Sequence, residues 1–416
     1  MSRVVVGLLV ALALATPAAA QEHHPEEASG TSWQPAVTPM TGAHAQAGGW
    51  MLMGHANLFV QLLYESGDIH RTSHQAGSIN WFMGMAERPI GDGRLGVRAM
   101  LSAEPWTIGG CGYPDLLATG EVCDGDTIHD LQHPHDLFME LAASYERPVG
   151  DRVRIHLYTA LAGEPALGPP AFPHRASAMP NPIAPIAHHW LDATHIAFGV
   201  VTAGVSSARW RVEGSAFNGR EPDDQRHGLE LAPLDSVSVR VAFAPSDRWS
   251  WQMSAGHLRD SEAGLGSQPR QDVTRATASA MYYRPLSSGG GWAVTIAYGV
   301  NTETDAVPEG LLTQATHAVL AESSVRSANG RHHWFGRIEA VGKPAHDLHV
   351  HEYITEVFTV GKAQVGYLHQ WPAIKGWAPG IGGHLNLSIV PPLLAPRYGG
   401  QVAPGVGVYV NLQPGW

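Results

Sequence analysis

Apolar and polar residues alternate along almost the whole chain from Gly48 onward, in segments of about ten residues. In the segment 236–243, valine or phenylalanine occupies every odd position, whereas serine or arginine occupies positions 236, 238 and 240. Segments 95–104, 152–158 and 209–216 repeat the alternation. A period of two is typical of β-strands with one apolar face, and patterns with a helical period are scarce. The sequence therefore predicts an all-β protein.

Short and long connectors alternate between these segments. The short connectors, which are rich in turn residues, cover 88–94, 147–152, 206–209, 244–248, 285–291 and 327–331. The long connectors cover 109–136, 164–193, 218–234, 259–271, 302–313 and 343–353. This alternation is typical of an up-and-down antiparallel meander. We count about 16 strands (14–18), which begin near residues 50, 78, 94, 137, 151, 194, 209, 235, 248, 272, 291, 314, 331, 355, 379 and 404.

The polar face of the predicted strands carries long charged side chains in nearly every segment. A closed sheet of about 16 strands is too wide for side chains to fill, so its interior must be aqueous or plugged. The apolar face would then meet lipid, as in a transmembrane up-and-down antiparallel β-barrel with a polar lumen and long outer loops. A secreted or periplasmic β-sandwich is the alternative. The predicted lumen-lining residues are Arg98, Glu104, Glu140, Arg152, Arg154, His156, Arg211, Glu213, Arg240, Arg275, Arg337 and Glu339.

The N-terminus has the pattern of an export signal. One arginine precedes an apolar run that ends in small residues, so residues 1–20 are predicted to be a cleaved signal peptide. A retained N-terminal anchor is the alternative. Residues 21–47 are polar and contain proline, glycine and alanine, which predicts a flexible lead. The barrel is then expected over residues 48–416, in the outer membrane of a Gram-negative bacterium. Aromatic residues near the segment ends fit interfacial girdles.

Charge and cysteine content narrow the possible functions. The net charge of −11 argues against nucleic-acid binding. The two cysteines, Cys111 and Cys123, are predicted to form a disulfide after export, worth about 3 kcal/mol in the chain-entropy model. Two free thiols that bind a metal are the alternative. No CxxCH motif is present, so covalent haem is not indicated.

The connector 164–193 contains seven prolines, which cannot donate to a sheet ladder. Connectors of this length are usually functional or disordered. Its apolar residues, among them Phe172 and Trp190, favour a packed lid or an inward-folded constriction. A rigid cap on the barrel mouth is the alternative.

Histidine is unusually frequent, with 24 residues in the chain, and eight of them lie between His129 and His195. Neutral imidazoles bind copper, zinc or nickel, and a carboxylate such as Asp136 or Asp192 would complete or orient such a site. The alternative is that these histidines only form hydrogen bonds with loop carbonyls and aspartates. The same two interpretations apply to the histidines of the segment 346–351. The candidate ligands for copper or zinc are His129, His133, His135, His188, His189 and His195.

Six blocks of the sequence have a further resemblance: "GTSWQP", "GGWMLMGHANLF", "SINWFMGMAERPIGDGRLGVRAMLSAEP", "QHPHDLFMELAASYERP", "GEPALGPPAFPHR" and "HHWLDATHIAFGV". Together they resemble an uncharacterised family of Gram-negative outer-membrane β-barrel proteins, over most of the chain from Gly30 onward. The resemblance implies the barrel fold and the outer membrane. It implies no activity and no role for any residue.

These observations favour a pore or loop-gated channel for a small polar or ionic solute. The mixed signs of the lumen charges predict no strong preference for anions or cations. One alternative is a barrel-anchored protein that binds copper or zinc through histidine-rich outer loops. The other is an outer-membrane hydrolase, but no GxSxG motif is present and no catalytic residue can be singled out, so no enzyme activity is expected. The expected partners are membrane lipid and the solute, and the sequence carries no signal for an oligomeric state.

Overall fold

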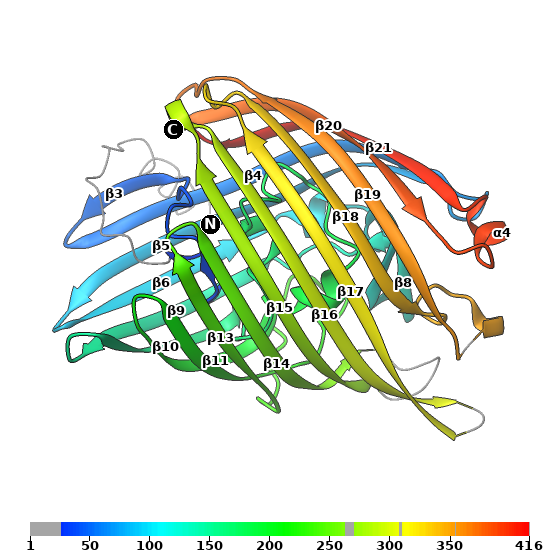
Figure 1. The fold of residues 1–416 in the computed structure, drawn as a ribbon, viewed down its shortest axis with the longest axis horizontal. Helices are drawn as coiled ribbons and strands as arrows, with labels where there is room; N and C mark the ends of the chain where they lie inside the picture. Colours follow the sequence, from blue (N-terminus) through cyan, green and yellow to red (C-terminus); the bar gives the residue numbers. More distant parts are fainter. Residues whose placement is uncertain (1–25, 263–269, 308–309, 354, 416) are drawn as a thin grey trace.

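A computed structural model describes residues 26–262, 270–307, 310–353 and 355–415. The predicted signal peptide lies outside these residues. Sixteen antiparallel strands form a closed barrel, in which β21 pairs with β4 to complete the ring (Figure 1). The wall strands are β4 (Trp50–Glu65), β5 (Ser73–Ile90), β6 (Gly93–Leu101), β9 (Phe138–Val149), β10 (Val153–Gly163), β11 (Ala197–Ser206), β12 (Trp210–Phe217), β13 (Ser236–Ser246), β14 (Trp249–Glu262), β15 (Gln271–Pro285), β16 (Gly291–Val307), β17 (Gly310–Arg326), β18 (His332–Pro344), β19 (Val357–Gln370), β20 (Trp377–Ile389) and β21 (Val402–Pro414).

The predicted transmembrane barrel and its strand count are confirmed. A short strand, β3 (Ala43–Ala47), pairs with the first residues of β4, beyond the part of β4 that β21 covers. The predicted long connector 302–313 was wrong, because β16 extends to Val307 and β17 begins at Gly310. The extended hairpin was missed because Thr302–Asp305 lack the apolar alternation of the lipid-facing segments.

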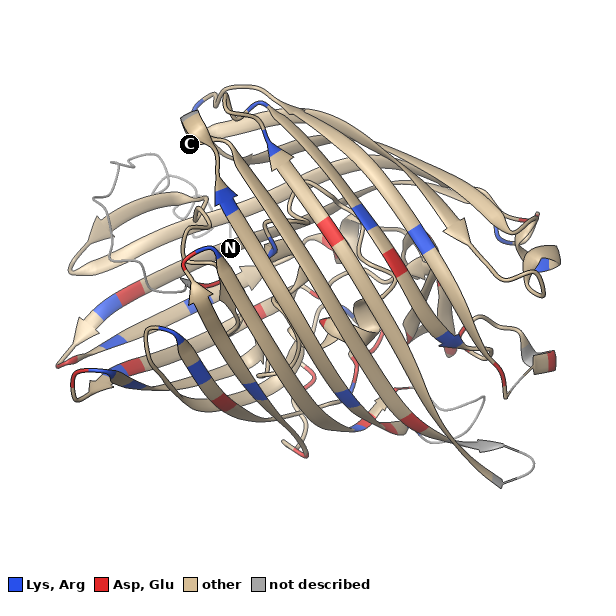
Figure 2. Cartoon of the chain, in the orientation of Figure 1, with Lys and Arg blue, Asp and Glu red and all other residues tan. Residues whose placement is uncertain are grey.

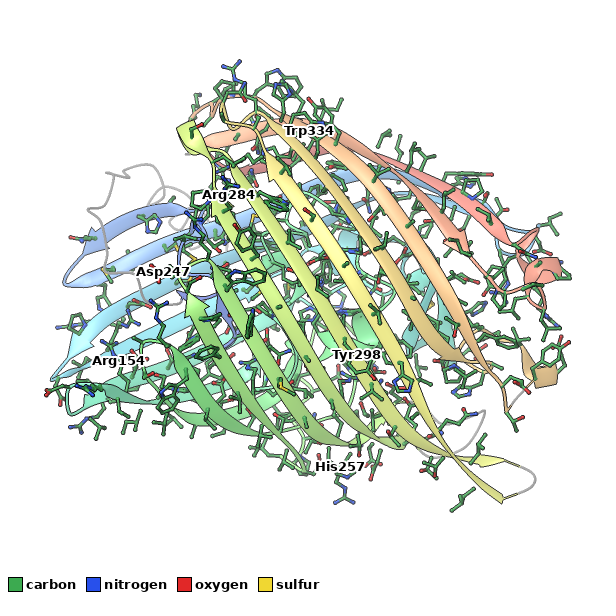
Figure 3. The ribbon with its side chains drawn as sticks, viewed as in Figure 1. Arg154, Asp247, His257, Arg284, Tyr298 and Trp334 are labelled. Atoms are coloured by element: carbon green, nitrogen blue, oxygen red, sulfur yellow. A yellow bond between two sulfur atoms is a disulfide. The ribbon has the colours of Figure 1, made fainter. Side chains whose placement is uncertain are left out.

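The outer face of the wall is apolar and exposed, because successive side chains of a strand point to opposite faces. Val239, Met253 and Ile338 are 59%, 70% and 63% exposed, respectively. Aromatic rings contact one another near the short-turn end, as Trp249 does with Tyr282 and Trp334 with Tyr367. Figure 3 labels Trp334 near this end and His257 near the opposite one. An apolar belt with an aromatic girdle is the surface that lipid requires.

Short helices occur only in the connectors among the described residues. They are α2 (Glu104–Thr107), η1 (Phe172–His174), α3 (His188–Leu191), η2 (Ala193–His195), η3 (Ser287–Gly289), η4 (His351–Tyr353) and α4 (Ala395–Tyr398). Within the same residues, no helix has the length and apolarity of a membrane span.

The lumen is occupied by three segments of the described chain, which we call together the plug. The hairpin insert (113–136) contains β7 (Tyr113–Cys123) and β8 (Asp126–Gln132). The proline-rich insert (164–195) contains η1, α3 and η2. The N-terminal insert (26–42) contains the paired strands β1 (Glu26–Glu27) and β2 (Trp33–Gln34).

The proline-rich insert crosses the lumen from one side of the wall to the other. Its backbone carbonyls at Met179 and Pro180 accept hydrogen bonds from Asn57 of β4 and Tyr409 of β21, at 3.2 and 2.8 Å. Trp190 donates through Nε1 to Thr316 Oγ1 of β17 at 2.8 Å. Of the packed lid, the inward-folded constriction and the rigid cap predicted for this connector, these contacts agree with the inward-folded constriction.

The N-terminal insert differs from the predicted flexible lead. Trp33 is 5% exposed, and its carbonyl accepts a hydrogen bond from Ser250 Oγ of β14. The Arg211 guanidinium lies 4.9 Å from the centre of the Trp33 ring, and it also donates to Glu27 at 2.8 Å. The polar composition was therefore misleading, because a charged lumen supplies partners for polar residues.

The apolar belt predicts a large cost for a charge at Val239, which points outward from the middle of β13. The Val239→Arg variant should lose about 2–4 kcal/mol of unfolding free energy in lipid vesicles. Val239→Leu keeps the belt apolar and should change stability little. Denaturant unfolding in vesicles measures both, and an unchanged stability for Val239→Arg would contradict the lipid-facing orientation.

The predicted disulfide is confirmed: Cys111, which precedes β7, is bonded to Cys123, the last residue of β7 before the β7–β8 turn. Because it closes a loop of 12 residues, its removal should cost about 3 kcal/mol of local stability. The Cys111→Ser/Cys123→Ser variant should therefore exchange amide hydrogens faster over residues 113–132, while β13 and β14 keep the wild-type rate. Equal exchange in the hairpin with and without the disulfide would contradict this role.

Candidate functional site

Buried charges of the wall meet buried charges of the plug throughout the lumen, and acidic and basic residues recur along the wall strands in Figure 2. Lys362 of β19 donates to Asp115 of the hairpin insert at 2.5 Å and to Glu65 of β4 at 3.2 Å. All three residues are at most 5% exposed. A buried charge is tolerated only when it is paired and hydrogen-bonded, so Lys362 ties the hairpin insert to the wall.

The proline-rich insert has an equivalent anchor. Arg175 is 1% exposed and donates to Asp192 of the same insert and to Glu322 of β17, both at 2.6 Å. Arg337 of β18 also donates to Glu322, at 3.1 Å, and to the Ile183 carbonyl at 2.8 Å. Arg175 therefore links the insert to an ion-pair network that continues into the wall.

The wall residues predicted from the alternation lie as follows. Nine of them are buried on the lumen side of their strands: Arg98, Glu140, His156, Arg211, Glu213, Arg240, Arg275, Arg337 and Glu339. Arg154 shares this face of β10 but is exposed at the rim, where it donates to Glu146 at 2.6 Å.

Two predicted wall residues lie elsewhere. Arg152 belongs to the exposed turn before β10, because that strand begins one residue later, at Val153. Glu104 belongs to α2, because β6 ends at Leu101, and it is fully buried in the connector. Its carboxylate accepts hydrogen bonds from the Asn80 amide at 3.1 Å and the His135 amide at 2.8 Å.

Five of the six predicted metal-ligand histidines gather where the hairpin and proline-rich inserts meet. We call His133, His135, His188, His189 and His195 the histidine cluster. Each is at most 8% exposed. The ring centroids are 6.0 Å apart for His133 and His188, 5.7 Å for His133 and His189, 5.5 Å for His188 and His189, 5.2 Å for His188 and His195, and 5.4 Å for His135 and His195.

The sixth histidine lies apart from the cluster. His129 stacks on His349 with a centroid distance of 3.8 Å, and His349 Nε2 lies 2.9 Å from Thr127 Oγ1. His349 belongs to the segment 346–351, whose histidines were also considered as metal ligands. It contacts His129 of the hairpin insert, and neither residue joins the histidine cluster.

Every ring of the histidine cluster has its Nδ1 atom beside an oxygen acceptor. The carboxylates of Glu104, Asp192 and Glu221 lie 2.9, 2.9 and 2.7 Å from Nδ1 of His135, His188 and His189, respectively. For His133 the acceptors are Glu121 and the Pro134 carbonyl, both at 3.3 Å, and for His195 the Asp192 carbonyl at 2.9 Å. These partners fix the proton on Nδ1 of a neutral ring.

Burial also favours the neutral form of most of these rings. It lowers the pKa of His133 and His195 well below the ordinary value, and the neighbouring histidines add to the effect. Burial lowers the pKa of His188 as well, against the opposing effect of Asp192. At His135, burial lowers the pKa, but the Glu104 carboxylate outweighs it, and the net pKa is raised.

A glycine makes room for the ring of His189 in the histidine cluster. Gly120 of β7 has a φ of +117°, and a Cβ atom there would lie 2.3 Å from Cε1 of His189. Only glycine allows this approach, because any other side chain would clash with the ring and strain the backbone.

Two groups of three donors lie within 4.8 Å of one another among the described residues. One consists of Cys111, Cys123 and Asp124, and its cysteines are already joined in the disulfide. The other consists of His189, Glu221 and Glu262. His189 therefore belongs both to this group and to the histidine cluster. Glu221 and Glu262 carry no recognisable signal in the sequence, because they lie 41 residues apart and Glu221 belongs to a connector without alternation.

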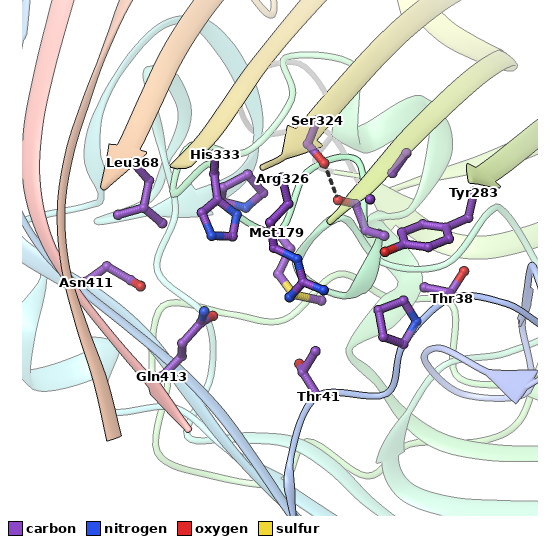
Figure 4. A pocket seen from close by; sticks show the side chains of 15 residues that line it. Thr38, Thr41, Met179, Tyr283, Ser324, Arg326, His333, Leu368, Asn411 and Gln413 are labelled. Atoms are coloured by element: carbon purple, nitrogen blue, oxygen red, sulfur yellow. Dashed lines mark hydrogen bonds between the residues drawn. The ribbon is translucent and has the colours of Figure 1, made fainter. Parts of the chain in front are cut away.

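A cavity opens at the short-turn end, between the plug and the wall (Figure 4). Its empty volume, which includes open solvent, is about 590 Å³, and its polar lining includes Thr38, Arg326, His333, Asn411 and Gln413. The Ser324 hydroxyl donates to the Ala176 carbonyl of the plug at 2.7 Å beside it. No hydrogen bond between two described side chains joins a serine to a histidine.

Comparison with solved structures supports the fold. Over 88% of this chain and 99% of the other, it superposes on a loop-deletion variant of OmpT, an outer-membrane protein of Vibrio cholerae, with a TM-score of 0.50 and 8% identity. On OmpF of Salmonella typhi in complex with daunomycin it superposes over 89% of this chain and 99% of the other, with a TM-score of 0.50 and 9% identity. On OprB of Pseudomonas putida at high pH it superposes over 88% of this chain and 94% of the other, with a TM-score of 0.52 and 8% identity.

The fold is thus that of a porin-like outer-membrane β-barrel. No family model matches the sequence, and no curated protein matches it. The resemblance to one particular uncharacterised family remains a prediction.

The Lys362 anchor predicts that its removal loosens the hairpin insert. Lys362→Met leaves Asp115 buried without its cation, which should cost about 3–5 kcal/mol. Replacing Asp115 by Asn in the Lys362→Met background removes one of the two carboxylates left without this cation, the other being Glu65, and should recover part of that loss. Amide exchange over residues 113–132 measures both effects, and wild-type protection in Lys362→Met would contradict the anchor.

Proposed function

We propose that this protein is a gated channel for a small polar or ionic solute in the outer membrane of a Gram-negative bacterium, reached after cleavage of residues 1–20. The observation that carries the proposal is a plug held in a wide polar lumen by ion pairs and hydrogen bonds. In this proposal the plug is the gate, and its displacement opens a path along the wall.

The width of the barrel supports a path for solute. A wall of sixteen strands encloses more space than its own side chains fill, and here segments of the same chain occupy that space. The lumen carries both signs of charge, so a displaced plug would leave a water-filled path without strong selectivity for anions or cations. The polar cavity at the short-turn end would form the periplasmic vestibule of this path.

The anchors of the plug support a gate. Arg175 joins the proline-rich insert to Glu322 of the wall, and Lys362 joins the wall to Asp115 of the hairpin insert. Apolar contacts add to them, since Leu116 and Trp190 of the plug pack in one cluster with Leu320 of the wall. Water can replace ion pairs and hydrogen bonds as the plug moves, so the polar anchors set the balance between closed and open states.

Single-channel recording in planar bilayers tests the gate. Arg175→Gln removes the ion pairs to Asp192 and Glu322, which should destabilise the closed state by about 3 kcal/mol. We expect the open probability to rise by about a hundredfold over wild type. Arg284→Gln makes the same chemical change at an exposed residue of β15, labelled in Figure 3, and should leave the open probability unchanged.

Two results would contradict the proposal. If wild type and Arg175→Gln are both silent over the full voltage range, the barrel is no channel. If both conduct with the same open probability, the plug is not the gate. Heat-modifiable gel mobility of each variant would show that the barrel has folded before the recording.

A further inference from the structure

The histidine cluster presents buried lone pairs that no group of the described chain satisfies. Because each Nδ1–H faces an oxygen acceptor, the second ring nitrogen, Nε2, carries a lone pair in the neutral ring. The Nε2 atoms of His133, His189 and His195 are buried and have no hydrogen-bond partner. A buried acceptor left unsatisfied is destabilising, because it has lost its hydrogen bond to water and gains none in the protein.

The same arrangement is typical of histidines that bind a metal. A metal-ligating histidine usually donates its other ring N–H to a carboxylate or a backbone carbonyl, which fixes the tautomer and the orientation of the ring. Glu221 has this position beside His189, and Glu121 with the Pro134 carbonyl has it beside His133. A cation bound to Nε2 of His133 and His189 would satisfy two of the three lone pairs that the protein leaves open.

The spacing of three rings fits a shared ion. Two imidazoles bound to one metal through Nε2, at roughly 2.0–2.1 Å, have centroids roughly 5–6 Å apart. The centroid distances among His133, His188 and His189 are 5.5–6.0 Å. Of the two donor groups within 4.8 Å among the described residues, the one that contains His189 adds Glu221 and Glu262, and it does not include His133 or His188. Small rotations of the His133, His188 and His189 rings are therefore needed before their three Nε2 atoms point at one ion.

The charge around the rings also favours a cation. Glu121, Glu221 and Asp192 lie within hydrogen-bond or ion-pair distance of the three rings. Arg226 pairs with Glu121, and Arg175 pairs with Asp192, so part of the negative charge is already compensated. Imidazole ligands with nearby carboxylates suit borderline metal ions such as copper(II), zinc and nickel better than calcium or magnesium.

We propose that the plug binds one divalent transition-metal ion of the copper, zinc and nickel class through His133, His188 and His189. The ion would join the hairpin insert, which supplies His133, to the proline-rich insert, which supplies the other two. This site goes beyond the proposed channel function and does not depend on conduction.

Titration calorimetry of the purified, folded full-length barrel with copper(II) chloride and zinc chloride tests the site. Wild type should bind one equivalent tightly. The His133→Ala/His189→Ala variant should bind that equivalent at least about a hundredfold more weakly, since two of three ligands are lost. His384→Ala is the matched control: His384 is also buried with Nε2 unpartnered, but it lies on β20 beside Gln364 and should leave the affinity unchanged.

A second measurement identifies the ligands. The electron paramagnetic resonance spectrum of the copper-loaded protein should show hyperfine coupling to about three nitrogens, and one fewer in His189→Gln. This single substitution serves if the double variant does not fold, as judged by its heat-modifiable mobility.

Absence of a tight equivalent in wild type, or wild-type affinity in the double variant, would overturn the site. So would loss of the tight equivalent in His129→Ala/His349→Ala, because binding would then belong to the stacked pair.

Discussion

The pairing of buried charges inside the barrel is the constraint on which the rest of the structure depends. A strand that alternates apolar and polar residues can face lipid on one side only if its charged side chains point into the lumen. Some of these charges pair within the wall, as Glu213 does with Arg240 and Glu140 with Arg98. Others, such as Lys362 and Arg211, find their partners on the plug. An unpaired buried charge would cost several kcal/mol, so the wall and the plug stabilise each other.

The wall could be predicted from the sequence because the signal is local. The alternation around Val239 fixes both the strand and its outward face, and Arg240 follows on the lumen side. The plug could not be predicted in the same way. Asp115 and Lys362 are 247 residues apart, and neither belongs to a pattern that names its partner. Glu104 shows the limit of the local rule, since it continues the alternation of β6 but lies on α2, beyond the end of the strand.

The candidate histidine site was predicted in part for a related reason. Barrel topology places the connectors 109–136 and 164–193 at one end, and this placement allows His133 to meet His188 and His189. Topology alone could not separate His129, which stacks instead on His349. The acceptors that hold the rings, such as Glu221, come from connectors without alternation, so only the folded chain shows them.

The location of the histidine cluster connects the two proposals. His133 and His189 lie on different inserts, with ring centroids 5.7 Å apart. An ion bound between them would stabilise the packed plug over any state in which the inserts separate, by the free energy of its binding. Metal occupancy would then bias the gate toward its closed state. The buried lone pairs and the polar anchors thus act on the same equilibrium.

Hydrogen exchange of the wild-type protein in lipid vesicles tests the central claim, which is that the plug is folded within the lumen. The account predicts that the amides of residues 164–195 which donate hydrogen bonds, such as Ala187 to Glu339, are protected to a degree comparable with the wall strands. Exchange of this segment at the rate of an unstructured loop, with the wall strands still protected, would contradict it.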